Sequence, residues 1–153
     1  FDIPKSPRVK IRVGDAGTVT RSFAPASRDV VIRDVFAVDK TPAELTSVDF
    51  VRTVDHSLAP GGLYILNCGD GPSLDGARAE VAALFEVFEQ VCLVADAAML
   101  KGRRRGNIII AASHSPLPAA GSAEAAAISR TLMGGGVPAQ YRDSAQTRQF
   151  ARL

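Results

Sequence analysis

The sequence predicts an α/β fold with a mostly parallel sheet and an antiparallel hairpin at one edge. Short apolar runs rich in β-branched residues alternate with segments of helical period, which is the pattern of a layered α/β protein. Because such runs are unbroken, the strands are expected to be covered on both faces. Five of them are expected to form strands, at residues 9–13, 29–36, 62–68, 91–95 and 107–112.

The last two strands should pair with each other in opposite directions. Only about ten residues connect them, which is too short for a parallel crossover. The connection is basic and contains glycine, with Lys101 and residues 103–105 as its cluster of positive charge. This cluster is interpreted as a solvated loop rather than a nucleic-acid site, because no aromatic residues interleave with it.

Helices are expected between the strands. Thr41 as N-cap, Pro42 at the first helical position and Glu44 at the third favour a helix start, and the helix should stop at the Pro-Gly-Gly of residues 60–62. A second apolar stripe at helical spacing predicts a helix with Glu80 on its polar side; the stripe consists of Ala77, Val81, Leu84, Phe85 and Phe88.

The C-terminal third predicts two further helices. Residues 122–133 are alanine-rich and end at three glycines, which is typical of a helix stop. Residues 137–153 should add a short strand and a polar helix.

Composition excludes several classes of protein. With 153 residues, 46% hydrophobic and 22% charged, the chain suits one globular domain and not a disordered one. No stretch approaches the roughly 18–20 apolar residues of a membrane helix. Cys68 and Cys92 lack scaffold or metal-site spacing and are expected to be small core residues, in a reducing, cytoplasmic setting. A net charge of +2 does not imply nucleic acid.

Acidic residues follow three consecutive predicted strands. Asp15 follows the first strand, Asp34 and Asp39 end or follow the second, and Asp70 follows the third. In open α/β sheets, ligands bind outside the carboxyl ends of the strands, so these carboxylates could share one site. Residues 41–100 hold nine Asp/Glu and two Lys/Arg, which suits a cationic ligand.

Structural roles compete with this interpretation. Asp15 could cap a helix, Asp34 could end a strand and Asp39 could be a polar loop residue; Asp70, between glycines, is interpreted as a turn residue. His56 and His114 are expected on the surface or in loops. Arg33 interrupts an apolar strand, so it should either pair with an acid or mark a site edge.

The motifs occur in the order found in a known family. The segments Gly14-Asp15-Ala16, residues 29–39, residues 41–46 with Phe50, and residues 58–62 resemble the spermidine synthase (polyamine aminopropyltransferase) family, and more closely the spermidine-synthase-like proteins of bacteria. The resemblance covers about residues 1–115. It implies a Rossmann-like S-adenosylmethionine-dependent methyltransferase fold.

The chain begins at Phe1 without Met, so residues 1–153 are expected to be the C-terminal part of a nucleoside-binding transferase domain. The first strands of the sheet and the glycine-rich nucleoside loop would then be missing.

The resemblance also implies roles for individual residues. Asp15 would accept a hydrogen bond from the adenine amino group of decarboxylated S-adenosylmethionine, with the Ala16 N–H facing the ring, and Pro42 would shape the loop over the nucleoside. Asp34 and Asp39 would be the catalytic acids, although the family spaces them three apart and this chain five. No metal is implied.

These roles suit the chemistry of aminopropyl transfer. An alkylamine with a pKa near about 10 is almost fully protonated at neutral pH, so a carboxylate must hold the ammonium and then accept its proton. We therefore expect the full-length protein to be a transferase acting on an amine such as putrescine.

Two alternatives remain open: a methyltransferase that uses S-adenosylmethionine itself, and a non-catalytic relative that serves in binding or dimerisation. The expected partners are the small-molecule nucleoside and amine. A homodimer stays open, and neither a nucleic-acid nor a membrane partner is expected.

Overall fold

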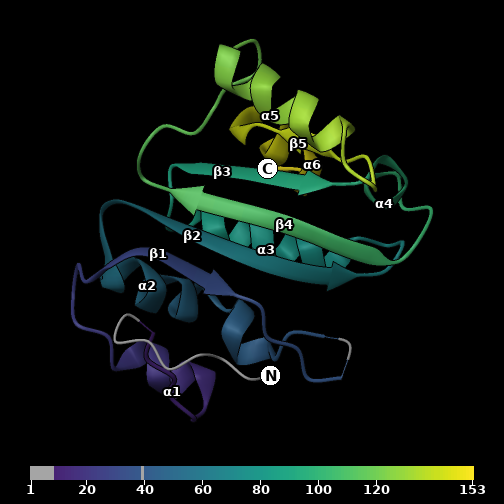
Figure 1. Cartoon of the computed structure of the whole chain (residues 1–153). Coiled ribbons are helices and arrows are strands. Elements are labelled where there is room, and N and C mark those ends of the chain that lie inside the picture. Colours follow the sequence, from purple (N-terminus) through teal and green to yellow (C-terminus); the bar gives the residue numbers. More distant parts are fainter. Residues whose placement is uncertain (1–8, 39) are drawn as a thin grey trace.

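A five-stranded sheet of order β1-β2-β4-β3-β5 forms the centre of the computed structural model, which describes residues 9–38 and 40–153 (Figure 1). Its strands are β1 (Arg28–Arg33), β2 (Leu58–Asp70), β3 (Gln90–Ala95), β4 (Gly106–Ser113) and β5 (Gln140–Arg142). Strands β1 and β2 run parallel, whereas β2–β4, β3–β4 and β3–β5 are antiparallel. The α/β class is confirmed, but the sheet is mixed rather than mostly parallel.

The order of the strands explains this correction. Strands β2 and β3 run in the same direction, and β4 inserts between them with the opposite direction. The predicted antiparallel pairing of β3 with β4 is confirmed. Its place at the sheet edge is wrong, because β5 pairs with the outer side of β3. The apolar runs did not reveal this order, since a buried strand reads the same in either direction.

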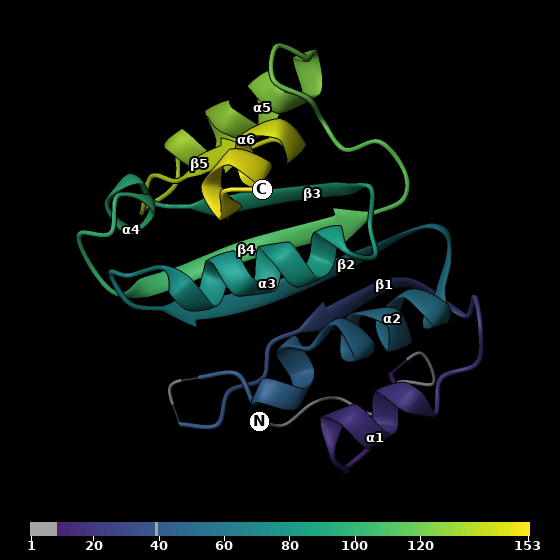
Figure 2. The same cartoon turned by 180° about the vertical axis from the view of Figure 1, so that it is seen from behind.

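Seven helical segments connect or flank these strands within the described ranges. They are α1 (Ala16–Arg21), the 3₁₀ turn η1 (Ala43–Thr46), α2 (Val48–Ser57), α3 (Asp75–Phe85), α4 (Ala97–Leu100), α5 (Ala123–Met133) and α6 (Ser144–Ala151). Figure 2 shows α2, α3 and α6 on one face of the sheet. In Figure 1 the other face of β1, β2 and β4 carries no described helix. Ile32 and Ile109 are accordingly exposed, so the expectation of cover on both faces is wrong for the described residues.

Two predicted boundaries shift. The helix expected from Thr41 is split into η1 and α2, because Ser47 is extended between them and its Oγ accepts a hydrogen bond from the Phe50 N–H at 3.2 Å. The predicted stop at residues 60–62 lies inside β2, where the register with β1 shifts; α2 itself ends at Ser57.

The first predicted strand does not form. Residues 9–13 have no strand assignment, and Val9, Ile11 and Val13 are exposed. A strand is stable only beside a hydrogen-bonding neighbour, and no described strand pairs with this segment.

The core lies between the sheet and the α2–α3 face. It includes Val54, Val81, Leu93 and Ile110, which are fully buried. Cys68 and Cys92 are buried free thiols, as expected. Within the described part of the chain, no helix has the length and apolarity needed to cross a membrane.

Candidate functional site

A cavity of about 690 Å³ opens at the carboxyl ends of β1 and β2. Its walls come from the loop after β1, from η1, from the end of β2, from the start of α3 and from the residues that begin β4. This volume is typical of a small-molecule site. The predicted location of a site, outside the carboxyl ends of adjacent strands, agrees with where the cavity lies.

Asp70 lies in the wall of this cavity at the end of β2. Its Oδ1 accepts a hydrogen bond from the Gly71 N–H at 2.7 Å, and its Oδ2 accepts one from the Ala77 N–H at 2.8 Å. Asp70 therefore caps the first turn of α3, whose own N-cap, Leu74, offers no side-chain acceptor. Asp70 was interpreted as a turn residue, whereas the structure places it at the end of β2; its contribution to the cavity wall was missed.

One residue of the cavity lining, Glu80, belongs to a buried ion pair. Arg33 Nη2 lies 2.6 Å from Glu80 Oε2, and Glu80 and Cys68 both line the cavity. Burial raises the pKa of Glu80, and the Arg33 guanidinium opposes that rise. Burial also raises the pKa of the Cys68 thiol, which keeps it protonated and unreactive.

Arg33 links the elements that enclose the cavity. Besides Glu80 of α3, it donates hydrogen bonds to the Leu45 carbonyl of η1 at 2.9 Å and to the Asn67 carbonyl of β2 at 3.4 Å. The expectation that Arg33 pairs with an acid is confirmed. The placement of Glu80 on the polar side of α3 was wrong, because the buried arginine draws it toward the core.

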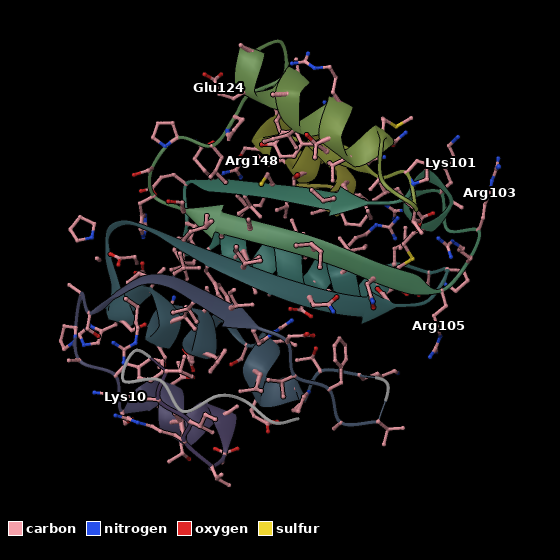
Figure 3. All side chains as sticks on the ribbon, viewed as in Figure 1. Lys10, Lys101, Arg103, Arg105, Glu124 and Arg148 are labelled. Atoms are coloured by element: carbon pink, nitrogen blue, oxygen red, sulfur yellow. The ribbon has the colours of Figure 1, made fainter. Side chains whose placement is uncertain are left out.

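Two cations also line the cavity. Lys40 comes from the loop after β1, and Arg105 immediately precedes β4. Figure 3 shows Arg105 with Lys101 and Arg103 along the connection between α4 and β4. The cavity wall thus contains charges of both signs.

The predicted catalytic residues lie outside the cavity lining or outside the described ranges. Asp34 directly follows β1 and is exposed, and its Oδ1 accepts a hydrogen bond from Asn67 Nδ2 at 3.1 Å. Asn67 precedes Cys68, which lines the cavity. Asp39 lies outside the described residues.

The predicted nucleoside residues lie at two helix starts. Asp15 is the N-cap of α1, where its Oδ1 accepts a hydrogen bond from the Thr18 N–H at 2.8 Å. This bonding lowers the pKa of Asp15. Ala16 is the first residue of α1, and Pro42 immediately precedes η1. The cavity wall includes none of the four described residues with a predicted role, which are Asp15, Ala16, Asp34 and Pro42. Their proposed roles therefore stay predictions.

A histidine cluster lies apart from the cavity walls and was also missed. His114, just after β4, directs Nε2 at Asp55 Oδ1, 2.8 Å away, and Nδ1 at Glu89 Oε2. Its ring lies 5.0 Å from that of Phe88. Because carboxylates only accept hydrogen bonds, this geometry selects the imidazolium. Partial burial disfavours that charge, but the two carboxylates outweigh it and raise the pKa of His114.

The comparisons with known proteins find similarity among solved structures. No family model matches the chain, and no curated protein does. Among solved structures, the chain is similar to the crystal structure of a probable spermidine synthase from Corynebacterium glutamicum ATCC 13032, at 57% sequence identity and a TM-score of 0.93. The match covers 98% of this chain and 54% of that one, so the chain spans about half the length of its neighbour.

Proposed function

Because the chain is a spermidine-synthase-like protein with the Rossmann-like methyltransferase fold, we propose that it belongs to an enzyme that transfers an aminopropyl group from decarboxylated S-adenosylmethionine to an amine. The observation that supports this most is the 57% identity over nearly the whole chain to a probable spermidine synthase. We propose that the amine binds in the cavity at the carboxyl ends of β1 and β2.

The proposed reaction needs a base and an aligned donor. The neutral amine attacks the carbon beside the sulfonium, the C–N bond forms, the C–S bond breaks and methylthioadenosine leaves. A carboxylate takes the proton that the amine loses. We assign this role to Asp34, which is exposed at the end of β1 and held by Asn67, and we assign binding of the ammonium to Asp39.

The nucleoside is proposed to bind near the start of α1. Asp15 is exposed there, and its carboxylate can accept a hydrogen bond from an adenine amino group beside the N–H of Ala16. Pro42 would shape the loop that leads into η1. Alignment of donor and acceptor for in-line displacement would then supply much of the rate.

A binding and turnover experiment tests this function. The longest natural polypeptide that contains this sequence is titrated calorimetrically with methylthioadenosine, S-adenosylmethionine and decarboxylated S-adenosylmethionine, and is then assayed with an amine and each donor. We expect the decarboxylated donor to be turned over with release of methylthioadenosine. Turnover of S-adenosylmethionine alone would make the protein a methyltransferase, and binding of none of the three would make it a non-catalytic relative.

A further inference from the structure

We propose that Asn67 positions Asp34 for proton transfer: the Asn67 side-chain amide binds one oxygen of the carboxylate and leaves the other oxygen for the amine. This inference rests on the proposed function, in which Asp34 accepts the proton. Asn67 is a positioning residue, because it acts through Asp34 and not on the substrate.

The two side chains meet across neighbouring strands of the sheet. Strands β1 and β2 lie side by side (Figure 1), and Arg33 of β1 is paired with Leu66 of β2. Asp34 and Asn67 are the next residues along these strands, and Asn67 Nδ2 donates a hydrogen bond to Asp34 Oδ1 at 3.1 Å. Among the described residues, Asp34 Oδ2 has no hydrogen-bond partner. The protein therefore holds one oxygen, and the other can accept a proton.

The oxygen of the Asn67 amide carries a cost that folding does not explain. Asn67 Oδ1 is buried and has no hydrogen-bond partner in the described part of the chain. Burial of an unpartnered polar atom costs free energy. Rotating the amide by half a turn would direct this oxygen at the Asp34 carboxylate, where two acceptors repel each other. The contact with Asp34 thus fixes the orientation of the amide, and an unsatisfied buried group of this kind is expected at a functional site.

The backbone of Asn67 is held firmly on both sides. Arg33 Nη2 donates a hydrogen bond to the Asn67 carbonyl at 3.4 Å, and the same nitrogen lies 2.6 Å from Glu80 Oε2. On the opposite side, Asn67 pairs with Ile109 of β4. Asn67 therefore lies on an inner strand of the sheet, whereas Asp34 is exposed beyond the end of an edge strand. A residue with fixed surroundings can orient one that lacks them.

This orientation matters for the proposed reaction step. The amine forms its bond to the carbon beside the sulfonium, the C–S bond breaks, and the amine's proton passes to Asp34 Oδ2. Proton transfer requires the amine nitrogen and the accepting oxygen to approach to about 2.6–3.2 Å. An exposed carboxylate that rotates freely meets this requirement for only part of the time, so fixing Oδ1 should raise kcat.

A double-variant cycle on turnover tests the proposal. With decarboxylated S-adenosylmethionine and putrescine, kcat and KM are measured for wild type, Asn67→Leu, Asp34→Asn and the double variant. We expect Asn67→Leu to lower kcat about tenfold, the effect of one hydrogen bond to a charged group, with the KM for each substrate unchanged. In the Asp34→Asn background the same change should alter kcat by less than about twofold, because no proton acceptor is then left to orient.

Further variants distinguish this role from a structural one. Asn67→Gln keeps the amide donor and should retain most of the wild-type kcat, and Asn67→Ala repeats the cycle if leucine disturbs the packing. The Tm of Asn67→Leu should not fall below that of wild type, because the substitution removes the unpartnered buried oxygen. The matched control is Gln90→Leu, at a half-buried amide where β3 begins, at the end of the sheet opposite to Asp34. It should turn over as wild type does.

The outcomes separate this inference from the proposed function. If Asp34→Asn is impaired but Asn67→Leu and Asn67→Ala turn over as wild type does, the inference is overturned and the aminopropyl transfer stands. An equal loss of kcat from Asn67→Leu in both backgrounds, or a raised KM with kcat unchanged, would also overturn it, because Asn67 would then not act through Asp34. If wild type turns over no amine, the proposed function fails and the inference fails with it.

Discussion

The guanidinium of Arg33 lies 2.6 Å from the carboxylate of Glu80, and both side chains are almost completely buried. The pair joins the end of β1 to α3, and through Leu45 it also holds η1. Burial of two charges is costly unless they remain paired. The pair therefore helps to hold three elements of the candidate site together.

Removing one member of the pair should be strongly destabilising. Arg33→Met leaves the Glu80 carboxylate buried without its partner, at a cost of about 3–5 kcal/mol. Urea denaturation measures this loss. Arg52→Met is the control, because Arg52 forms an exposed pair with Asp49 and should change stability by less than about 0.5 kcal/mol.

The double variant Arg33→Met/Glu80→Leu separates pairing from packing. It should recover much of the stability that Arg33→Met loses, since no unpaired charge then stays buried. A double variant whose loss in unfolding free energy equals the sum of the losses of the two single variants would instead show that the two residues act independently.

The histidine cluster predicts a pH-dependent stability. Because the pKa of His114 is raised in the folded protein, its contribution is fully present below the unfolded value of about 6.5. The contribution is lost as pH rises through the folded pKa. Thermal unfolding between pH 5.5 and 9 should show a decline in Tm that is smaller in His114→Gln.

His56→Gln provides the comparison for this profile. His56 is exposed on α2, next to Asp55 in sequence. The His56→Gln variant should show the same dependence of Tm on pH as wild type. Parallel profiles for wild type and His114→Gln would show that the cluster contributes nothing to folding.

Gly102 allows a tight connection before β4. Its φ is +65°, and a Cβ there would lie 2.5 Å from the Pro72 carbonyl oxygen. Gly102→Ala should cost at least about 1–3 kcal/mol, the usual range for a strained backbone. Gly136→Ala, where a Cβ meets no atom within 4 Å, should be close to neutral; equal effects of the two changes in urea denaturation would refute this explanation.

The sequence predicts the positions of the helices and strands better than it predicts which strands pair with each other. The apolar runs locate the strands from β1 to β4, and the stripe on α3 is confirmed at Ala77, Val81 and Leu84. These patterns are local, because burial of one face repeats along one element. Pairing is not local. The insertion of β4 between β2 and β3, and the lack of a described partner strand for residues 9–13, therefore did not follow from periodicity.

The location of the candidate site was easier to predict from the sequence than the identity of the residues that line it. The carboxyl ends of β1 and β2 were identified, and Arg33 in an apolar strand indicated either pairing with an acid or the edge of a site. Glu80 itself lies on another element, and Lys40 and Arg105 lie in connections whose course depends on tertiary packing. Residue type and spacing alone therefore did not indicate that cations line the cavity.

The assignment of Asp15 to the nucleoside predicts a change in affinity. Asp15→Ala should weaken calorimetric binding of methylthioadenosine by about tenfold or more, the loss expected for one hydrogen bond to a charged group. The substitution also removes the N-cap of α1. Ser47→Ala, which removes the side-chain cap of α2, controls for that loss and should bind the nucleoside normally; equal affinity in wild type and Asp15→Ala would refute the assignment.

The role of Asp34 as proton acceptor is the central claim, and steady-state turnover of the Asp34→Asn enzyme tests it most directly. The amide keeps the shape and can still accept a hydrogen bond, but it cannot hold the amine's proton. We predict a fall in kcat of about 10²–10⁴-fold, the range for a general base, with the affinity for methylthioadenosine unchanged. The control is Asp29→Asn, at an exposed aspartate of β1, which should be as active as wild type. Undiminished turnover in Asp34→Asn would contradict the claim.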